Sequence, residues 1–148
     1  MPVTRRVFLA SFAAATAIPA AMARAGGGIA LDGEGKAIRG YDARGYFTAA
    51  TARVGVAAHS VVWQGAEWRF ASAEDAAAFA AAPNTFAPQF GGYCTRAMSF
   101  KRLVPADPEV WRIYGDKLYM FARPVGGEKF DEGQDAMIAK AKAYWDTL

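Results

Sequence analysis

The chain has 148 residues, with 17 Lys or Arg, 14 Asp or Glu, one histidine and one cysteine. Three basic residues, Arg5, Arg6 and Arg24, precede residue 26 and no acidic residue does; subtracting them from 17 leaves residues 26–148 with 14 basic and 14 acidic side chains. A single cysteine cannot form an intramolecular disulfide. Residues 26–148 are formally neutral and therefore lack the positive field that binding to nucleic acid or anionic lipid requires.

Residues 1–25 have the three parts of a secretory signal. Arg5 and Arg6 form a charged start, residues 7–22 are apolar and rich in alanine, and residues 23–25 place small side chains at the cleavage positions. Paired arginines before Phe-Leu are typical of the twin-arginine route. The apolar run of about 15 residues is shorter than the roughly 20 that span a bilayer. We therefore expect export by the twin-arginine machinery, cleavage after Ala25 and a soluble periplasmic protein without a stable membrane anchor.

The segment after the cleavage point divides into a leader and a domain. Residues 26–37 are rich in glycine and are expected to form a flexible leader. Residues 38–148 have the length of one domain. At its start, residues 42–50 predict a short helix with Asp42 as N-cap and Tyr46 facing inward.

The next two segments predict a β-hairpin. Residues 59–63 alternate and include β-branched side chains, and residues 67–71 follow after a turn at residues 64–66. Within the second strand, Trp68 and Phe70 share one face, which we expect to be buried.

A helix and an aromatic turn follow the hairpin. Ser72 stands three residues before a carboxylate, which predicts a helix N-cap, and the helix is expected to run through Phe79 and to end before Pro83. Residues 86–94 combine aromatic side chains with two glycines, a composition that favours tight turns and close backbone approaches.

The remaining segments predict a second hairpin and a closing helix. Residues 111–114 and 118–121 alternate on either side of Gly115-Asp116. Residues 128–145 carry apolar side chains at helical spacing, and Gly133 is a weak point in that helix. The elements together predict an α+β fold, a small single domain of short antiparallel β-hairpins packed against helices, with an amphipathic helix at the C-terminus.

Several segments follow one another in a characteristic order: an aromatic strand, a glycine turn, an aromatic-x-Phe strand, a serine cap and a helix that contains Phe and is followed by Pro. Further matches flank them. The segments are residues 40–42, 46–47, 62–74, 87–94, 107–111 and 115–119. This set resembles the YHS domain in its exported branch, and the resemblance covers residues 38–148. Metal-handling members of that family, by resemblance, place thiols at the positions of Gly45, Ala71 and Asp75, and all three thiols are absent here.

Cys94 is the main candidate for chemistry in the mature chain. An exposed free thiol meets oxidants outside the cytoplasm, so Cys94 is expected either to be buried or to have a function. Met98 lies one helical turn further if Cys94 begins a helix, and His59 is the only histidine. Cysteine, methionine and histidine bind soft metals, so a Cu(I) or zinc ion is a candidate cofactor. The alternative places Cys94 and Met98 in the core and leaves His59 exposed.

A ligand pocket beside Cys94 is the second candidate. Tyr93, Asp42 and Tyr46 are its predicted lining, although Asp42 also suits the role of a helix cap. Arg96, Lys101 and Arg102 form the densest basic group and are interpreted as a solvated face; they do not predict a phosphate site.

Three functions are compatible with these features. The first is a binding or accessory module for a small ligand or a soft metal, centred on Cys94. The second is a structural or interaction domain in which Cys94 is only core, and the third is a thiol-redox enzyme that uses Cys94. The lack of an assignable catalytic triad favours a protein that is not an enzyme, and no protein partner other than the export machinery is indicated.

Overall fold

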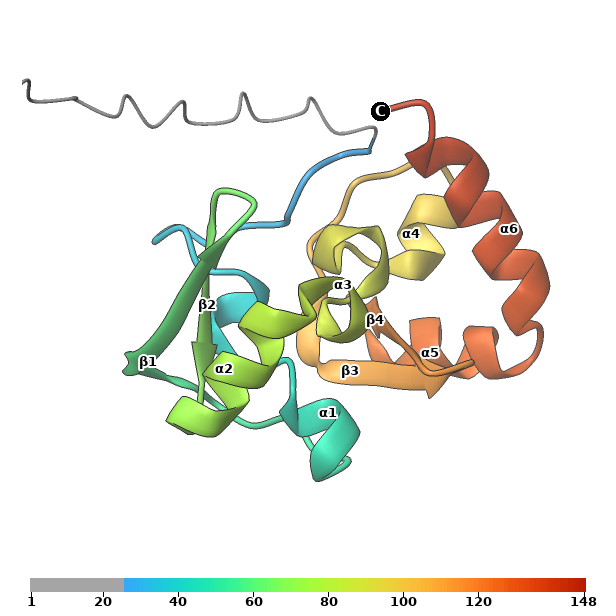
Figure 1. Cartoon of the computed structure of the whole chain (residues 1–148). Helices are drawn as coiled ribbons and strands as arrows, with labels where there is room; N and C mark the ends of the chain where they lie inside the picture. The colour runs from blue at the N-terminus through green and yellow to red at the C-terminus, as the bar shows by residue number, and fades with distance from the viewer. Residues whose placement is uncertain (1–25) are drawn as a thin grey trace, which may run out of the picture.

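Two antiparallel hairpins and the helices packed around them make up the domain (Figure 1). The computed structural model describes residues 26–148. In the first hairpin, β1 (Val56–Trp63) pairs with β2 (Ala66–Phe70); in the second, β3 (Asp107–Tyr114) pairs with β4 (Lys117–Phe121). The helical segments are η1 (Ile38–Gly40), α1 (Gly45–Thr48), α2 (Ala73–Ala81), α3 (Pro83–Phe86), η2 (Gln89–Gly92), α4 (Thr95–Ser99), α5 (Pro124–Asp131) and α6 (Gln134–Trp145). The predicted α+β fold is confirmed.

Both hairpins turn on two residues with positive φ. Gln64 and Gly65 have φ of 56° and 74°, and Gly115 and Asp116 have φ of 54° and 58°. Positive φ at both central residues matches the right-handed twist of the paired strands. Each first strand begins earlier than the sequence predicts, at Val56 and at Asp107, and each has a register shift between its early and late pairs. The first residues of β1 and β3 lack the alternation of apolar and polar side chains by which a strand is recognised in a sequence.

The capping signal before α2 is confirmed. The Ser72 hydroxyl accepts a hydrogen bond from the Asp75 backbone N–H at 3.1 Å. The helix ends at Ala81, before Pro83, and α3 then begins with that proline in its first turn. Proline suits this position because its missing N–H would have no helical partner there.

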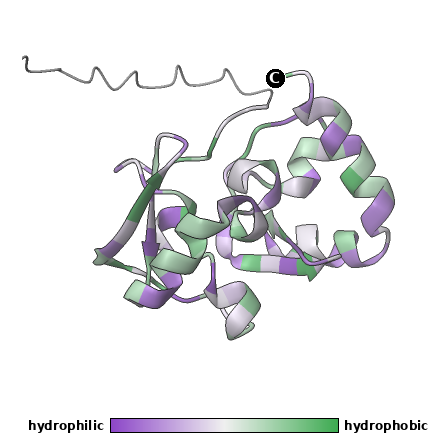
Figure 2. Ribbon diagram, viewed as in Figure 1, coloured by the Kyte–Doolittle hydropathy of each residue, from purple (hydrophilic) through white to green (hydrophobic). Residues whose placement is uncertain are grey.

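The predicted closing helix is two helices. The chain breaks at Gly133, where φ is −174° and ψ is 70°, and α5 and α6 lie on either side of it. Glycine costs about 1 kcal/mol in a helix interior relative to alanine, so a break there is inexpensive. Figure 2 shows hydrophobic and hydrophilic residues interspersed along α6, and its Met137 and Ile138 pack against the core around Phe130.

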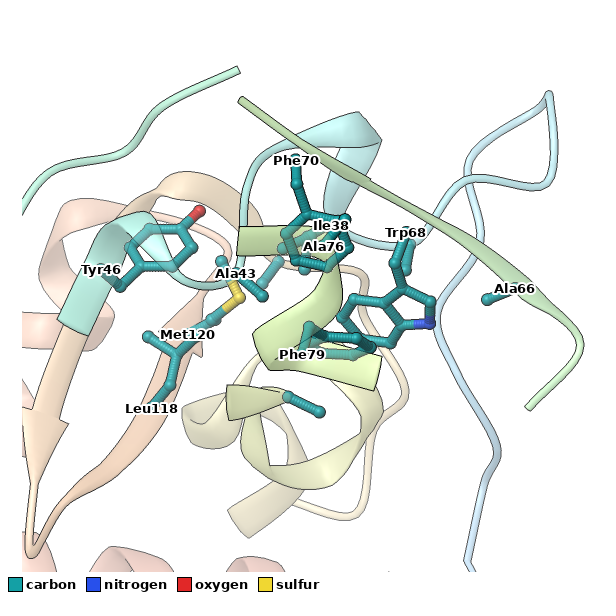
Figure 3. Close-up of a cluster of buried hydrophobic side chains, with 13 residues drawn as sticks. Ile38, Ala43, Tyr46, Ala66, Trp68, Phe70, Ala76, Phe79, Leu118 and Met120 are labelled. Atoms are coloured by element: carbon teal, nitrogen blue, oxygen red, sulfur yellow. The ribbon is translucent and has the colours of Figure 1, made fainter. Parts of the chain in front are cut away.

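The two hairpins share one core (Figure 3). Trp68 and Phe70 of β2 meet Phe79 of α2, with ring centroids 4.9 and 5.0 Å apart, which confirms the predicted buried face. Leu118 and Met120 of β4 belong to the same cluster. Burial of each such side chain contributes about 1.5–3 kcal/mol, so side chains from β2 and β4 hold the two sheets together.

Residues 26–37, which the sequence predicts as a flexible leader, pack against the domain in the structure. The Ala30 N–H donates to the Gly91 carbonyl at 2.9 Å, and the Ala37 N–H donates to the Glu67 carbonyl at 2.9 Å. The Ala37 side chain is fully buried. Backbone hydrogen bonds hold this segment, and composition carries no sign of them.

The predicted signal falls outside the described residues. Between residues 26 and 148, none of the helices has both the length and the apolar character needed to cross a bilayer.

Candidate functional site

Cys94 begins a helix, as the candidate metal arrangement requires. It is the N-cap of α4, and its Sγ accepts a hydrogen bond from the Ala97 N–H at 3.4 Å. Only 5% of the residue is exposed. Its neighbours in the second hydrophobic cluster include Phe121 and Phe130. The thiol is therefore held in place at the edge of an aromatic cluster.

A cavity of about 380 Å³ lies beside this thiol. We call it the Cys94 cavity. Its walls come from α4, from the loop that follows α4, and from the turn between β4 and α5. The lining residues that matter here are Cys94, Arg96, Phe100, Arg102, Arg123 and Val125. Two chemical classes meet in it, guanidinium groups and apolar side chains.

The three arginines of the Cys94 cavity have no acidic partner among residues 26–148. Arg96 lies over the Phe100 ring at 5.7 Å from its centroid, and neither Arg102 nor Arg123 forms an ion pair. Of the other five arginines in residues 26–148, all but Arg39 are paired with carboxylates: Arg44, Arg53, Arg69 and Arg112. The positive charge at the cavity is thus uncompensated, although residues 26–148 are neutral as a whole.

The sequence does not predict this cavity. Arg96 and Arg102 belong to a basic group typical of a solvated face, and Arg123 stands more than twenty positions away in the chain. The hairpin of β3 and β4 returns the chain so that Arg123, directly before α5, lies by α4. No local pattern signals that meeting. Converging guanidinium groups bind carboxylates and other planar anions, so the arrangement suits an anion.

The proposed metal ligands are only partly brought together. Met98 is fully buried, and its N–H donates to the Cys94 carbonyl at 2.9 Å, so the two residues share one helical turn. His59 lies on β1, which Figure 1 shows at the left edge of the molecule, far from α4 at the right. Within residues 26–148, no three His, Cys, Asp or Glu side chains are grouped as a metal site requires.

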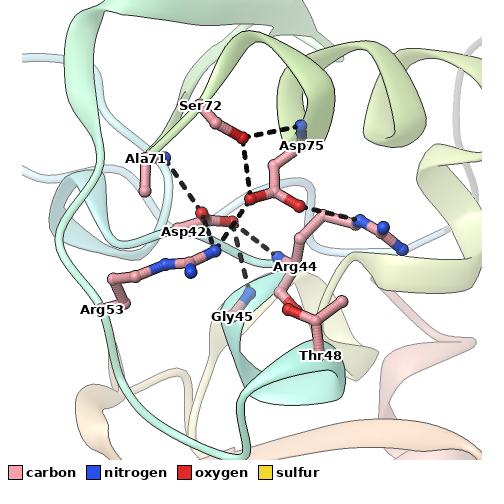
Figure 4. Close-up of polar contacts among 8 residues, drawn as sticks. All are labelled: Asp42, Arg44, Gly45, Thr48, Arg53, Ala71, Ser72 and Asp75. Carbon is pink, nitrogen blue, oxygen red and sulfur yellow. Dashed lines mark hydrogen bonds and ion pairs between the residues drawn. The ribbon is translucent and has the colours of Figure 1, made fainter.

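Asp42 lies in a separate polar network (Figure 4). Its carboxylate is fully buried. One oxygen accepts from the Arg44 and Gly45 N–H groups at 2.8 and 3.3 Å, and the other accepts from the Ala71 N–H at 2.9 Å and the Arg53 guanidinium at 2.7 Å. The predicted cap position is wrong, because α1 begins at Gly45 and its N-cap is Arg44; Asp42 instead binds the backbone just before and at the start of this helix. Donors of the chain itself occupy both oxygens, which leaves this carboxylate with a structural role.

The positions at which the family resemblance places thiols meet around this network. Gly45 and Ala71 donate to Asp42, and the Arg53 guanidinium also donates to Asp75 at 2.9 Å. The hydrogen bond to Asp42 is the largest of the influences that raise the pKa of Arg53, so the guanidinium stays charged. The Arg53 guanidinium and the carboxylates of Asp42 and Asp75 therefore occupy the place where the resemblance puts the thiols.

The other predicted ligand-binding residues also lie away from the Cys94 cavity. Tyr46 is buried, and its hydroxyl donates to the Pro108 carbonyl at 2.8 Å. Tyr93 directly precedes Cys94, but its ring packs toward Trp145 at a centroid distance of 6.5 Å. Neither residue lines the cavity. The residues predicted as one pocket are distributed over three places.

We expect Tyr46→Phe to lower the free energy of unfolding by about 1–2 kcal/mol, because it leaves the buried Pro108 carbonyl without its donor. Burial raises the pKa of the Tyr46 hydroxyl. The neutral phenol therefore contributes its full stability below the unfolded-state pKa of about 10, and that contribution declines as pH rises above it. The decline should be shallower in Tyr46→Phe. Urea unfolding at pH 7 and at pH 9–11 checks both effects.

The half-buried Tyr144 provides the control, since its hydroxyl makes no hydrogen bond within residues 26–148. Tyr144→Phe should change the stability by less than about 0.5 kcal/mol. Equal stability of Tyr46→Phe and wild type at every pH would contradict the assigned hydrogen bond.

Comparison of the chain with protein-family models, curated proteins and solved structures finds no match.

Proposed function

We propose that this protein is a binding module for a small organic carboxylate, held in the Cys94 cavity by Arg96, Arg102 and Arg123. The observation that carries the proposal is that three arginines without acidic partners in residues 26–148 line one cavity. Arg102 and Arg123 are exposed and Arg96 is half-buried, so their positive charges are open to an anion that enters the cavity.

The shape and lining of the cavity support a ligand with an apolar body. Its volume of about 380 Å³ falls in the range of small-molecule sites. Phe100, Val104 and Val125 supply apolar surface beside the arginines, and 65% of Phe100 is exposed. A carboxylate can bind a guanidinium through two parallel hydrogen bonds while its hydrocarbon part covers these side chains.

The same charges disfavour the metal alternative. A Cu(I) or Zn²⁺ ion at Cys94 would lie in a cavity lined by three positively charged side chains, whose charges repel a cation. Met98 is the nearest soft ligand along the chain, whereas His59 is remote from α4. The geometry supports the ligand-binding form of the hypothesis over the metal-binding form.

The proposal includes a periplasmic location and membership of the exported YHS-like group. The arginine pair and apolar run in residues 1–25 support the location. The meeting of Gly45, Ala71 and Asp75 around one carboxylate supports the resemblance, since these positions are far apart in the sequence. In this setting the cavity serves a binding or accessory role, and no catalytic step is assigned to Cys94.

Isothermal titration of the purified protein with benzoate and hexanoate tests the binding function. We expect both to bind, and we expect benzamide and hexanamide, which lack the charge, not to bind. A hydrogen bond to a charged group is worth about 1.5–3 kcal/mol, so Arg102→Gln and Arg123→Gln should each weaken carboxylate binding by about 10-fold or more.

Arg39→Gln is the matched control. Arg39 is an exposed arginine without an acidic partner in the described residues, and it lies outside the Cys94 cavity. It should leave carboxylate binding unchanged. Equal binding of the carboxylates and the amides, or Cu(I) binding that is lost in Cys94→Ser while no carboxylate binds, would overturn the proposal.

A further inference from the structure

A second cleft, of about 390 Å³, lies where the first hairpin, the segment before Cys94 and the end of α6 meet. We call it the Trp63–Trp145 cleft. Its chemistry is carried by Trp63, Gln64, Asn84, Gln89, Lys117 and Trp145. None of these residues lines the Cys94 cavity, so the two sites are independent.

Both tryptophans of this cleft are half-buried and braced by other rings. Trp63 lies 5.7 Å from Trp68 and 5.8 Å from Phe79 between ring centroids, and Trp145 lies 6.0 Å from Phe90 in an edge-to-face contact. Such contacts fix the indole planes before any ligand arrives. Rigid aromatic surfaces bind flat or ring-shaped molecules at low entropic cost.

The polar side chains of the cleft have unused hydrogen-bonding capacity. The amides of Gln64, Asn84 and Gln89 make no side-chain hydrogen bond within residues 26–148, and each offers two donors and one acceptor. Lys117 forms no ion pair with any carboxylate of residues 26–148. Three amides and one ammonium group surround two indole rings.

The backbone that carries this lining is tightly constrained. Phe90 and Gly91 in η2 have φ of 55° and 64°, both in the left-handed region. A Cβ on Gly91 would lie 1.9 Å from the Gly28 carbonyl oxygen, so residues 28 and 91 touch through their backbones. The wall of the cleft is therefore a fixed structure, which suits a preformed binding site.

We propose that the Trp63–Trp145 cleft binds an acidic saccharide. The C–H face of a pyranose ring would stack on an indole, whose π face is electronegative. The ring hydroxyls, each both donor and acceptor, match the side-chain amides. A carboxylate on the sugar would pair with Lys117. A purely apolar ligand would leave three amides desolvated and unpaired, which costs binding energy.

Titration of the full protein with digalacturonate and with cellobiose, followed by tryptophan fluorescence and calorimetry, tests this site. We expect both disaccharides to change the fluorescence and digalacturonate to bind more tightly. Lys117→Gln should weaken digalacturonate binding by about 5-fold or more and leave cellobiose binding unchanged. Asn84→Ala should weaken both, because the amide meets hydroxyl groups common to the two sugars.

Two controls distinguish this site from the Cys94 cavity and from general charge effects. Lys101→Gln removes a surface lysine outside the cleft and should not alter sugar binding. Arg123→Gln should weaken carboxylate binding at the Cys94 cavity and leave sugar binding intact. The inference is overturned if neither disaccharide binds, or if Lys117→Gln and Asn84→Ala bind digalacturonate as well as wild type does.

Discussion

Asp42→Ala is expected to lower the free energy of unfolding by about 3–5 kcal/mol, the loss that follows when one partner of a buried ion pair is removed. The Asp42 carboxylate is fully buried and accepts from three backbone N–H groups and the Arg53 guanidinium. Its removal leaves the Arg44 and Ala71 N–H groups without an acceptor and deprives the Arg53 guanidinium of one of its two carboxylate partners. Urea unfolding followed by circular dichroism measures the change.

Two further variants make this result specific. Asp42→Asn keeps one carbonyl oxygen as an acceptor and loses the charge, so we expect a smaller loss than for alanine. Asp146 pairs with Lys142 on the surface, where more than half of each side chain is exposed, and Asp146→Ala should cost less than about 1 kcal/mol. If Asp42→Ala cost no more than Asp146→Ala, the structural role of the network would be wrong.

Gly91→Ala has the second largest expected effect. The left-handed φ of 64° penalises a side chain by about 1–2 kcal/mol. In addition, the new Cβ would collide with the Gly28 carbonyl oxygen 1.9 Å away, a backbone atom that cannot rotate aside. We therefore expect a total loss of about 3 kcal/mol or more, together with release of residues 26–31 from the domain, measurable as faster proteolysis of that segment.

Gly115 provides the matched control for this variant. It has a similar φ of 54°, but a Cβ there would meet nothing within 4 Å. Gly115→Ala should therefore show only the conformational penalty of about 1–2 kcal/mol, without release of the N-terminal segment. Equal losses in the two variants would mean that residues 26–31 do not press on Gly91.

The elements predicted correctly from the sequence have local causes. Gln64-Gly65 and Gly115-Asp116 are turn pairs whose conformation is decided by the residues themselves, and the Ser72 cap acts on a backbone N–H three positions away. Such signals need no knowledge of the rest of the fold. The alternation of Trp68 and Phe70 in β2 likewise identified the buried face.

The features that the sequence did not predict depend on contacts between distant residues. Residues 26–37 are held by backbone hydrogen bonds to Gly91 and Glu67, which leave no trace in composition. Arg123 joins Arg96 and Arg102 only because the β3–β4 hairpin reverses the chain. His59 and Cys94 are both plausible ligands by type, but β1 and α4, which position them, lie apart in the fold (Figure 1). Residue type therefore identified Cys94, and tertiary structure determined its neighbours.

Binding of an organic anion in the Cys94 cavity should change the environment of the backbone amides around it. Amide chemical shifts of the ¹⁵N-labelled protein during titration with benzoate measure this change, because they report where the ligand binds. We expect saturable shifts at Ala97, Ala122 and Gly126, which line the cavity, and none around Asp42. Saturable shifts confined to other parts of the domain, or no shifts at millimolar benzoate, would contradict it.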